Sequence, residues 1–149
     1  MLTAVALAQR GQGWVEPNPM VGCVLAQGDR VMARGWHQRC GGPHAEIHCD
    51  MYVTLEPCSH QGKTPPCVDA VIAARPRRVI VAQRDPNPLV QGRGVRRLRA
   101  AGIEVVAPFP VPAAQRQLEP FRKFITTGYP WVIAKWAQTL DGRIATRTG

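Results

Sequence analysis

Long apolar runs are absent from this sequence, and none approaches the roughly 20 residues that a helix needs to cross a bilayer. A membrane protein is therefore not expected. The apolar stretch at residues 2–8 is short and no basic segment precedes it, so we expect no signal peptide and a cytoplasmic protein. Aromatic residues make up only 6% of the chain and form no cluster. Modules that bind RNA by base stacking need such clusters, so this class of protein is disfavoured.

Acidic residues are also scarce: the chain has 10 Asp and Glu but 19 Lys and Arg, which gives a net charge of +9. The basic side chains are scattered, as at 75–78 and 93–99, without a long run or interleaved aromatic residues. This pattern favours a solvated surface, with a phosphate-bearing ligand as the second interpretation. No nucleic-acid partner and no membrane partner are expected, and a homo-oligomer stays open.

Five cysteines are an odd number for a chain without a secretion signal, which indicates metal or thiol chemistry rather than a disulfide framework. Cys23, Cys40 and Cys49 are interpreted as small apolar residues or thiols outside any site. The length of 149 residues and the 45% hydrophobic content suit one packed domain.

Short apolar runs alternate with helical patterns along the chain, which is typical of an α/β protein. Two β-prone runs meet at Gly28-Asp29, so a hairpin is expected there. The last stretch differs, because an apolar strand-like run at 131–137 follows the final helix and Gly128. We therefore expect a first domain over residues 1–127 and the beginning of a second over 128–149. Strands are expected at 20–26, 30–37, 51–55, 78–82 and 103–106, and helices at 2–9, 66–74, 94–101 and 113–124.

His44, Cys58 and Cys67 form the strongest chemical pattern, because one imidazole and two thiolates make a three-ligand zinc set. Three protein ligands leave a coordination position open for water, whereas structural zinc sites are usually closed by four. Prolines precede both cysteines, as they do at the start of helices, where the backbone dipole stabilises a thiolate.

Glu46 follows His44 by two residues, as in the His-x-Glu…Pro-Cys pattern of zinc deaminases, in which the glutamate moves protons and binds no metal. We therefore predict that Glu46 is the catalytic acid and base. The second half of the motif in this sequence differs from the deaminase pattern. The two cysteines are separated by eight residues (59–66), whereas the pattern has two. A structural zinc knuckle, or two unrelated core cysteines beside a surface histidine, is the alternative interpretation.

Five motifs accompany this insert. They are Asn18-Pro19-Met20-Val21-Gly22, Gly41-Gly42-Pro43-His44-Ala45-Glu46, Thr54-Leu55-Glu56-Pro57-Cys58-Ser59-His60, Gly62-Lys63-Thr64-Pro65-Pro66-Cys67 and Asp85-Pro86-Asn87-Pro88. Together they resemble the deaminase domain of the bifunctional riboflavin-biosynthesis deaminase/reductase family, and the resemblance covers essentially the whole chain.

The resemblance implies a three-layer α/β/α sandwich of the cytidine-deaminase-like fold, with a mixed central sheet of about five strands. It also implies hydrolytic deamination of 2,5-diamino-6-ribosylamino-4(3H)-pyrimidinone 5′-phosphate, with Zn²⁺ as cofactor and this phosphorylated pyrimidine as partner. The family positions that match Asn18 and His37 lie beside the pyrimidine and the ribose. Those that match Lys63 and Asn87 serve the phosphate end, and a lysine ammonium is chemically suited to a dianionic phosphate.

The segment Lys135–Ala145 resembles the first strand and turn of the family's reductase domain, where Ala137 matches a backbone contact with the cofactor. NADPH-dependent reduction of the ribose is therefore expected only with a complete reductase domain. One departure from the family lies after Glu46, where a helix of several turns is expected. Here about a dozen residues, or three helical turns, are absent. A genuine deletion and an omitted mobile segment are both compatible with this difference.

A nucleobase or tRNA deaminase is the alternative enzyme, which the positive charge would also suit. The long insert with its Lys63 argues against it. From a different class, a zinc-stabilised RNA-binding module would need a fourth ligand and stacking aromatic residues.

Overall fold

A five-stranded mixed sheet forms the centre of the computed structural model, which describes residues 1–15, 18–37, 50–61 and 65–145. The order of the strands in the sheet is β2-β1-β3-β4-β5. β1 is antiparallel to both β2 and β3, whereas β3, β4 and β5 are parallel to one another. The strands are β1 (Gly22–Gln27), β2 (Arg30–Trp36), β3 (Asp50–Val53), β4 (Arg78–Val81) and β5 (Glu104–Val106).

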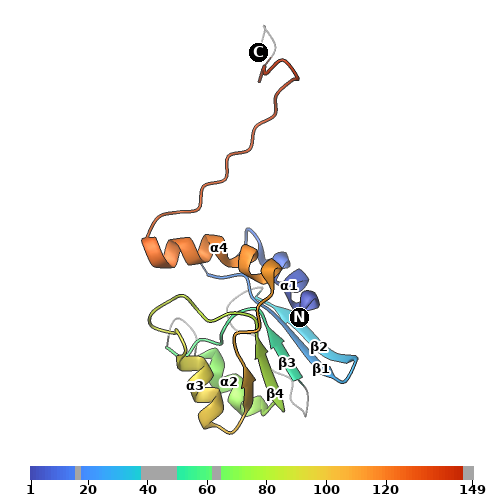
Figure 1. The fold of residues 1–149 in the computed structure, drawn as a ribbon, viewed down its shortest axis with the longest axis vertical. Coiled ribbons are helices and arrows are strands. Elements are labelled where there is room, and N and C mark those ends of the chain that lie inside the picture. Colours follow the sequence, from blue (N-terminus) through green and yellow to red (C-terminus); the bar gives the residue numbers. More distant parts are fainter. Residues whose placement is uncertain (16–17, 38–49, 62–64, 146–149) are drawn as a thin grey trace.

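Helices cover both faces of the sheet and make a three-layer α/β/α sandwich (Figure 1). On one face lie α2 (Cys67–Ala74) and α3 (Arg93–Ala100), whose apolar side chains join the main core. On the other lie α1 (Leu2–Ala8), the short 3₁₀ helix η1 (Gln9–Gly11) and α4 (Pro112–Thr127). No helix in these ranges is long and apolar enough to cross a membrane. The main core consists of Met51, Val53, Val68, Val71, Val79, Val81, Val95, Leu98, Ile103 and Val105.

The contact between α1 and β1 depends on the absence of a side chain at Gly22. A Cβ atom at this position would lie 1.9 Å from the carbonyl oxygen of Ala4. The Gly22 N–H donates to Thr54 Oγ1 at 3.1 Å, and the Thr54 N–H donates to the Gly22 oxygen at 3.2 Å. The first residue of β1 is thus fixed both to α1 and to the segment that follows β3.

The predicted α/β architecture is confirmed, and every helix and strand expected within residues 1–127 lies within a few residues of its predicted range. The hairpin is also confirmed, because β1 and β2 pair on either side of Gly28, whose φ of 58° favours glycine.

The strand predicted at 131–137 is wrong, since residues 129–139 form no strand and Trp131, Val132 and Ile133 are exposed. A strand requires a hydrogen-bonded neighbour, and the chain after α4 runs away from the body of the domain (Figure 1). The domain boundary between residues 127 and 128 stays a prediction.

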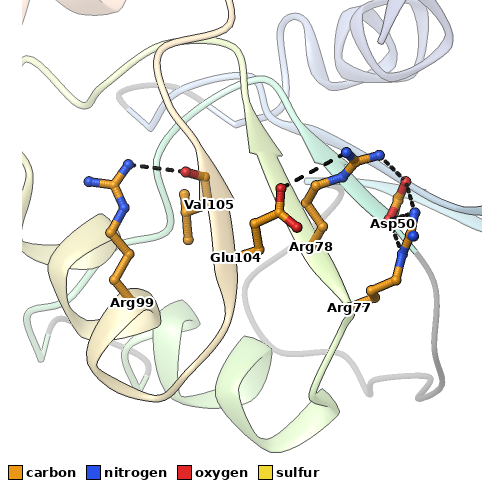
Figure 2. Close-up of polar contacts among 6 residues, drawn as sticks. All are labelled: Asp50, Arg77, Arg78, Arg99, Glu104 and Val105. Carbon is orange, nitrogen blue, oxygen red and sulfur yellow. Dashed lines mark hydrogen bonds and ion pairs between the residues drawn. The ribbon is translucent and has the colours of Figure 1, made fainter.

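Charged side chains join the amino-terminal ends of β3, β4 and β5 (Figure 2). Asp50, Arg78 and Glu104 stand in register as the first residues of these strands. The Asp50 carboxylate, on a residue only 7% exposed, accepts hydrogen bonds from Arg77 Nε at 3.0 Å and from Arg78 at 2.6 Å. Burial would raise the pKa of Asp50, but the hydrogen bonds and charges of the two guanidinium groups outweigh burial and lower it.

Replacing Asp50 with Asn should lower the free energy of unfolding at neutral pH by about 1–3 kcal/mol, because two guanidinium groups lose their anionic partner. A folded-state pKa below the unfolded value stabilises the protein above the unfolded pKa, and this stabilisation is lost as the pH falls through the folded value. Urea unfolding should therefore show a difference between wild type and Asp50→Asn that shrinks progressively as the pH falls below about 4, the usual pKa of an aspartate. Asp29→Asn, in the exposed turn between β1 and β2, is the control. A difference that does not change with pH would contradict this account.

Candidate active site

The strand order brings four segments of the chain to one edge of the sheet. Because β1 is antiparallel to its neighbours, its first residue lies beside the last residues of β2 and β3. β4 is parallel to β3 and ends at the same edge. Open α/β sheets bind their ligands at such carboxyl edges. Four predicted site residues follow or precede these strand ends, namely Asn18 before β1, His37 after β2, Cys58 after β3 and Asn87 after β4.

His37 contacts the segment that carries Asn18. The His37 N–H donates to the Val21 oxygen at 2.8 Å, and His37 Nδ1 lies 3.3 Å from the Pro19 oxygen. The Asn18 N–H donates to the Val15 oxygen at 2.8 Å, which fixes the turn before β1. The structure therefore places the two residues predicted near the pyrimidine and the ribose on adjoining segments.

Cys58 and Cys67 lie together where α2 begins. The Cys67 N–H donates to Cys58 Sγ at 3.2 Å, and the Val68 N–H donates to the Cys58 oxygen at 3.1 Å. Hydrogen bonds from the side chain and backbone of Cys67 lower the pKa of the Cys58 thiol to about 6, against the opposing effect of burial. The lowered pKa favours the thiolate form of Cys58, which is the form of cysteine that binds metal ions. In contrast, burial raises the pKa of the Cys23 thiol in β1 to about 11.

Glu56 is a buried residue of this edge that the sequence analysis missed. Glu56 is 3% exposed and precedes Cys58 by two residues in the sequence. The carboxylate accepts backbone N–H groups from Asp85 at 3.3 Å, Gly92 at 2.9 Å and Val95 at 3.0 Å. Because these donors are backbone groups of a distant segment, no local motif around Glu56 reveals them.

Asn87 lies in the loop between β4 and α3, where its side chain stabilises a turn. Asn87 Oδ1 accepts the Leu89 N–H at 3.0 Å, and the Asn87 N–H donates to Asp85 Oδ1 at 2.8 Å. Burial raises the pKa of the Asp85 carboxyl group. Asn87 therefore has a structural task in this loop whether or not it also contacts a ligand.

Other predicted residues do not join this group. Ala137 lies in the exposed segment after α4, which leaves the body of the domain (Figure 1). His44, Glu46 and Lys63 lie outside the described residues. Among the residues that the structure does describe, no three His, Cys, Asp or Glu side chains gather closely enough to hold a metal ion.

A cavity of about 330 Å³ lies elsewhere, between η1 and α4, with Gln12, Arg116 and Gln117 among its lining residues. None of the predicted site residues that the structure describes lines it. The paired cysteines, rather than this cavity, therefore mark the candidate active site.

The mixed sheet between two helical layers, with paired cysteines at the start of a helix on its carboxyl edge, defines a protein of the cytidine-deaminase-like class. No family model matches the chain. Curated relatives do match it. Riboflavin biosynthesis protein RibD of Aquifex aeolicus is 44% identical over 160 residues, which cover 100% of this chain and 45% of that protein. The RibD protein of Escherichia coli is 45% identical over 160 residues, which cover 100% of this chain and 44% of that protein.

Solved structures give the same result. Acinetobacter baumannii RibD, form 1, matches with a TM-score of 0.84 and 42% identity, over 95% of this chain and 43% of that one. A diaminohydroxyphosphoribosylaminopyrimidine deaminase/5-amino-6-(5-phosphoribosylamino)uracil reductase from Thermotoga maritima matches with a TM-score of 0.86 and 40% identity, over 100% of this chain and 46% of that one.

The chain thus corresponds to the deaminase part of the riboflavin-biosynthesis proteins that it matches. It spans less than half the length of the curated relatives that it matches. The first two alignments extend over 160 positions for 149 residues, so the relatives have at least 11 residues that this chain lacks. These 11 residues are close in number to the dozen or so that the comparison of motifs predicts to be missing after Glu46.

Proposed function

We propose that this chain catalyses the hydrolytic deamination of 2,5-diamino-6-ribosylamino-4(3H)-pyrimidinone 5′-phosphate in riboflavin synthesis. The observation that carries the proposal is the Cys58–Cys67 pair at the start of α2, in a chain 44% identical to a riboflavin biosynthesis protein. The Thermotoga maritima relative is named as a deaminase of a phosphoribosylaminopyrimidine, which is this class of substrate.

Zn²⁺ suits the two thiol groups, of Cys58 and Cys67, that lie together at the start of α2. Thiolate and imidazole are ligands that zinc prefers, and the low pKa of Cys58 favours its anionic form. His44, Cys58 and Cys67 are the proposed ligands, and the assignment of His44 rests on the sequence pattern. Zinc supplies a Lewis acid that makes water nucleophilic near neutral pH.

Glu46 is the proposed proton carrier, also on the strength of the sequence pattern. Its carboxylate accepts a proton from the attacking water, passes one to the ring nitrogen and protonates the departing amine. A C–O bond forms, the exocyclic C–N bond breaks, and one water is consumed for each ammonia released.

The remaining predicted residues are proposed to bind the substrate. Asn18 and His37 are assigned to the pyrimidine and the ribose, which their adjoining positions beyond β1 and β2 support. Lys63 and Asn87 are assigned to the phosphate. For the longer relatives we propose a further reductase part that uses NADPH, and Ala137 is assigned to the cofactor side of that part.

Cys67→Ala should remove most of the zinc from the purified protein, because one of three protein ligands is lost. Metal analysis by plasma mass spectrometry measures the ratio of zinc to protein. Cys23→Ala, which removes the partly buried thiol of β1, is the matched control and should keep its zinc. Full retention of zinc by Cys67→Ala would remove Cys67 from the ligand set.

Glu46→Gln should keep its zinc but release ammonia about 100- to 10,000-fold more slowly, because a carboxamide cannot accept the proton of water. Ammonia release from the phosphorylated pyrimidine measures turnover directly. If the variant retained a large part of the wild-type rate, the acid/base assignment of Glu46 would be wrong.

Lys63→Ala should raise the KM for the phosphorylated substrate about 10- to 150-fold, which is the effect of losing one hydrogen bond to a charged group. The KM for the dephosphorylated riboside should change little. Steady-state kinetics with both substrates make the comparison, and Lys123→Ala in α4 is the matched lysine control. An equal effect on both substrates would show that Lys63 supports the loop and does not bind phosphate.

A further inference from the structure

We infer that Glu56 is a positioning residue that holds the loop between β4 and α3 against the segment carrying Cys58. The inference rests on the proposed function, because that function assigns Asn87 in this loop to the substrate. Its structural basis is a buried carboxylate whose three hydrogen-bond donors are backbone groups of this loop and of α3.

Glu56 first acts as the cap of α3 from a distant part of the chain. The N-cap residue of α3 is Gly92, which provides no side-chain hydrogen bond. Glu56 Oε1 accepts the Val95 N–H at 3.0 Å, and Oε2 accepts the Gly92 N–H at 2.9 Å. The side chain of an N-cap residue normally accepts the N–H of Val95, the third residue of the helix, and in a capping box the side chain of that third residue accepts the N–H of the N-cap residue. Glu56 makes both bonds here, and its negative charge is favoured by the helix dipole. Glu56 therefore fixes where α3 begins.

The absence of a side chain at Gly94 permits this close approach. A Cβ atom on Gly94 would lie 2.1 Å from the Pro57 oxygen and 3.2 Å from Glu56 Oε1. The first turn of α3 thus packs directly on the two residues that precede Cys58. Any displacement of Glu56 changes the distance between α3 and this segment.

The same carboxylate also fixes the loop that carries Asn87. Glu56 Oε2 accepts the Asp85 N–H at 3.3 Å. Asp85 Oδ1 in turn accepts the Asn87 N–H at 2.8 Å, and Asn87 Oδ1 accepts the Leu89 N–H at 3.0 Å. These three bonds follow one another along the loop, so the turn from 85 to 89 is linked to Glu56 through the N–H of Asp85.

The cysteine pair does not depend on the Glu56 carboxylate in this way. Cys58 is held by the N–H groups of Cys67 and Val68. The backbone of Glu56 is held separately, because its N–H donates to the Gln83 oxygen at 3.0 Å. Loss of the carboxylate should therefore loosen the substrate loop and leave the proposed zinc ligands in place.

Glu56→Gln tests this separation, because a carboxamide keeps one acceptor oxygen and turns its NH₂ group toward an N–H donor. We expect the KM for the phosphorylated pyrimidine to rise about 5- to 20-fold, with kcat within about twofold and zinc content unchanged. Glu104→Gln, an exposed carboxylate at the opposite edge of the sheet, is the matched control and should leave all three values unchanged. An unchanged KM, or a parallel loss of zinc and kcat, would overturn the inference.

Hydrogen exchange provides a test that needs no turnover. In the wild-type protein the amides of Asp85, Gly92 and Val95 should exchange slowly. In Glu56→Gln these three amides should exchange at least about tenfold faster, whereas the exchange rates of the amides in β3 and β4 should not change. If Glu56→Gln does not fold, fast exchange of these amides in the wild type would overturn the inference and slow exchange would support it. A wild-type protein with slow exchange but no deaminase activity would contradict the proposed function and leave the anchoring role of Glu56 intact.

Discussion

The antiparallel direction of β1 between β2 and β3 is the constraint on which the rest of this site depends. It turns the start of one strand and the ends of three others toward the same edge of the sheet. A fully parallel sheet would place Asn18 and His37 at opposite edges. The close approach of Gly22 to α1, and its paired hydrogen bonds with Thr54, fix β1 in this register. The gathering of the candidate residues is thus a consequence of topology before any side chain contributes to it.

The two edges of the sheet bury a carboxylate in different ways. At the amino edge, Asp50 is neutralised by two arginines, which ties the strands together at an edge with no predicted site residue. At the carboxyl edge, Glu56 is satisfied by backbone N–H groups instead, so its charge brings no cationic side chain into the site. Both arrangements meet the requirement that a buried charge be fully hydrogen-bonded. The second needs no cationic side chain, because backbone N–H groups satisfy the carboxylate.

The sequence was sufficient for the layered α/β fold, because short β-branched runs and amphipathic helices have different periods. It also identified Cys58 and Cys67 as a pair, since their spacing and flanking prolines are local features. It differed from the structure at 131–137, where an apolar run forms no strand with the residues that the structure describes. Glu56 could not be found because its partners lie 29 to 39 residues away and donate from the backbone. The close approach of α3 at Gly94 was not predicted either, because a single glycine does not say which distant segment packs against it.

The hydrogen bonds between the two ends of the insert explain how two cysteines separated by eight residues, rather than two, still lie together. The Cys67 N–H reaches Cys58 Sγ and the Val68 N–H reaches the Cys58 oxygen, so the two ends of the insert meet at the start of α2. Once the ends are joined there, the free energy of loop closure rises only with the logarithm of loop length. The insert can therefore differ in length and composition while the sulfur atoms stay where α2 and β3 place them. The proposed role of Lys63 in phosphate binding is compatible with this arrangement, because a substitution within the insert leaves the bonds at its two ends in place.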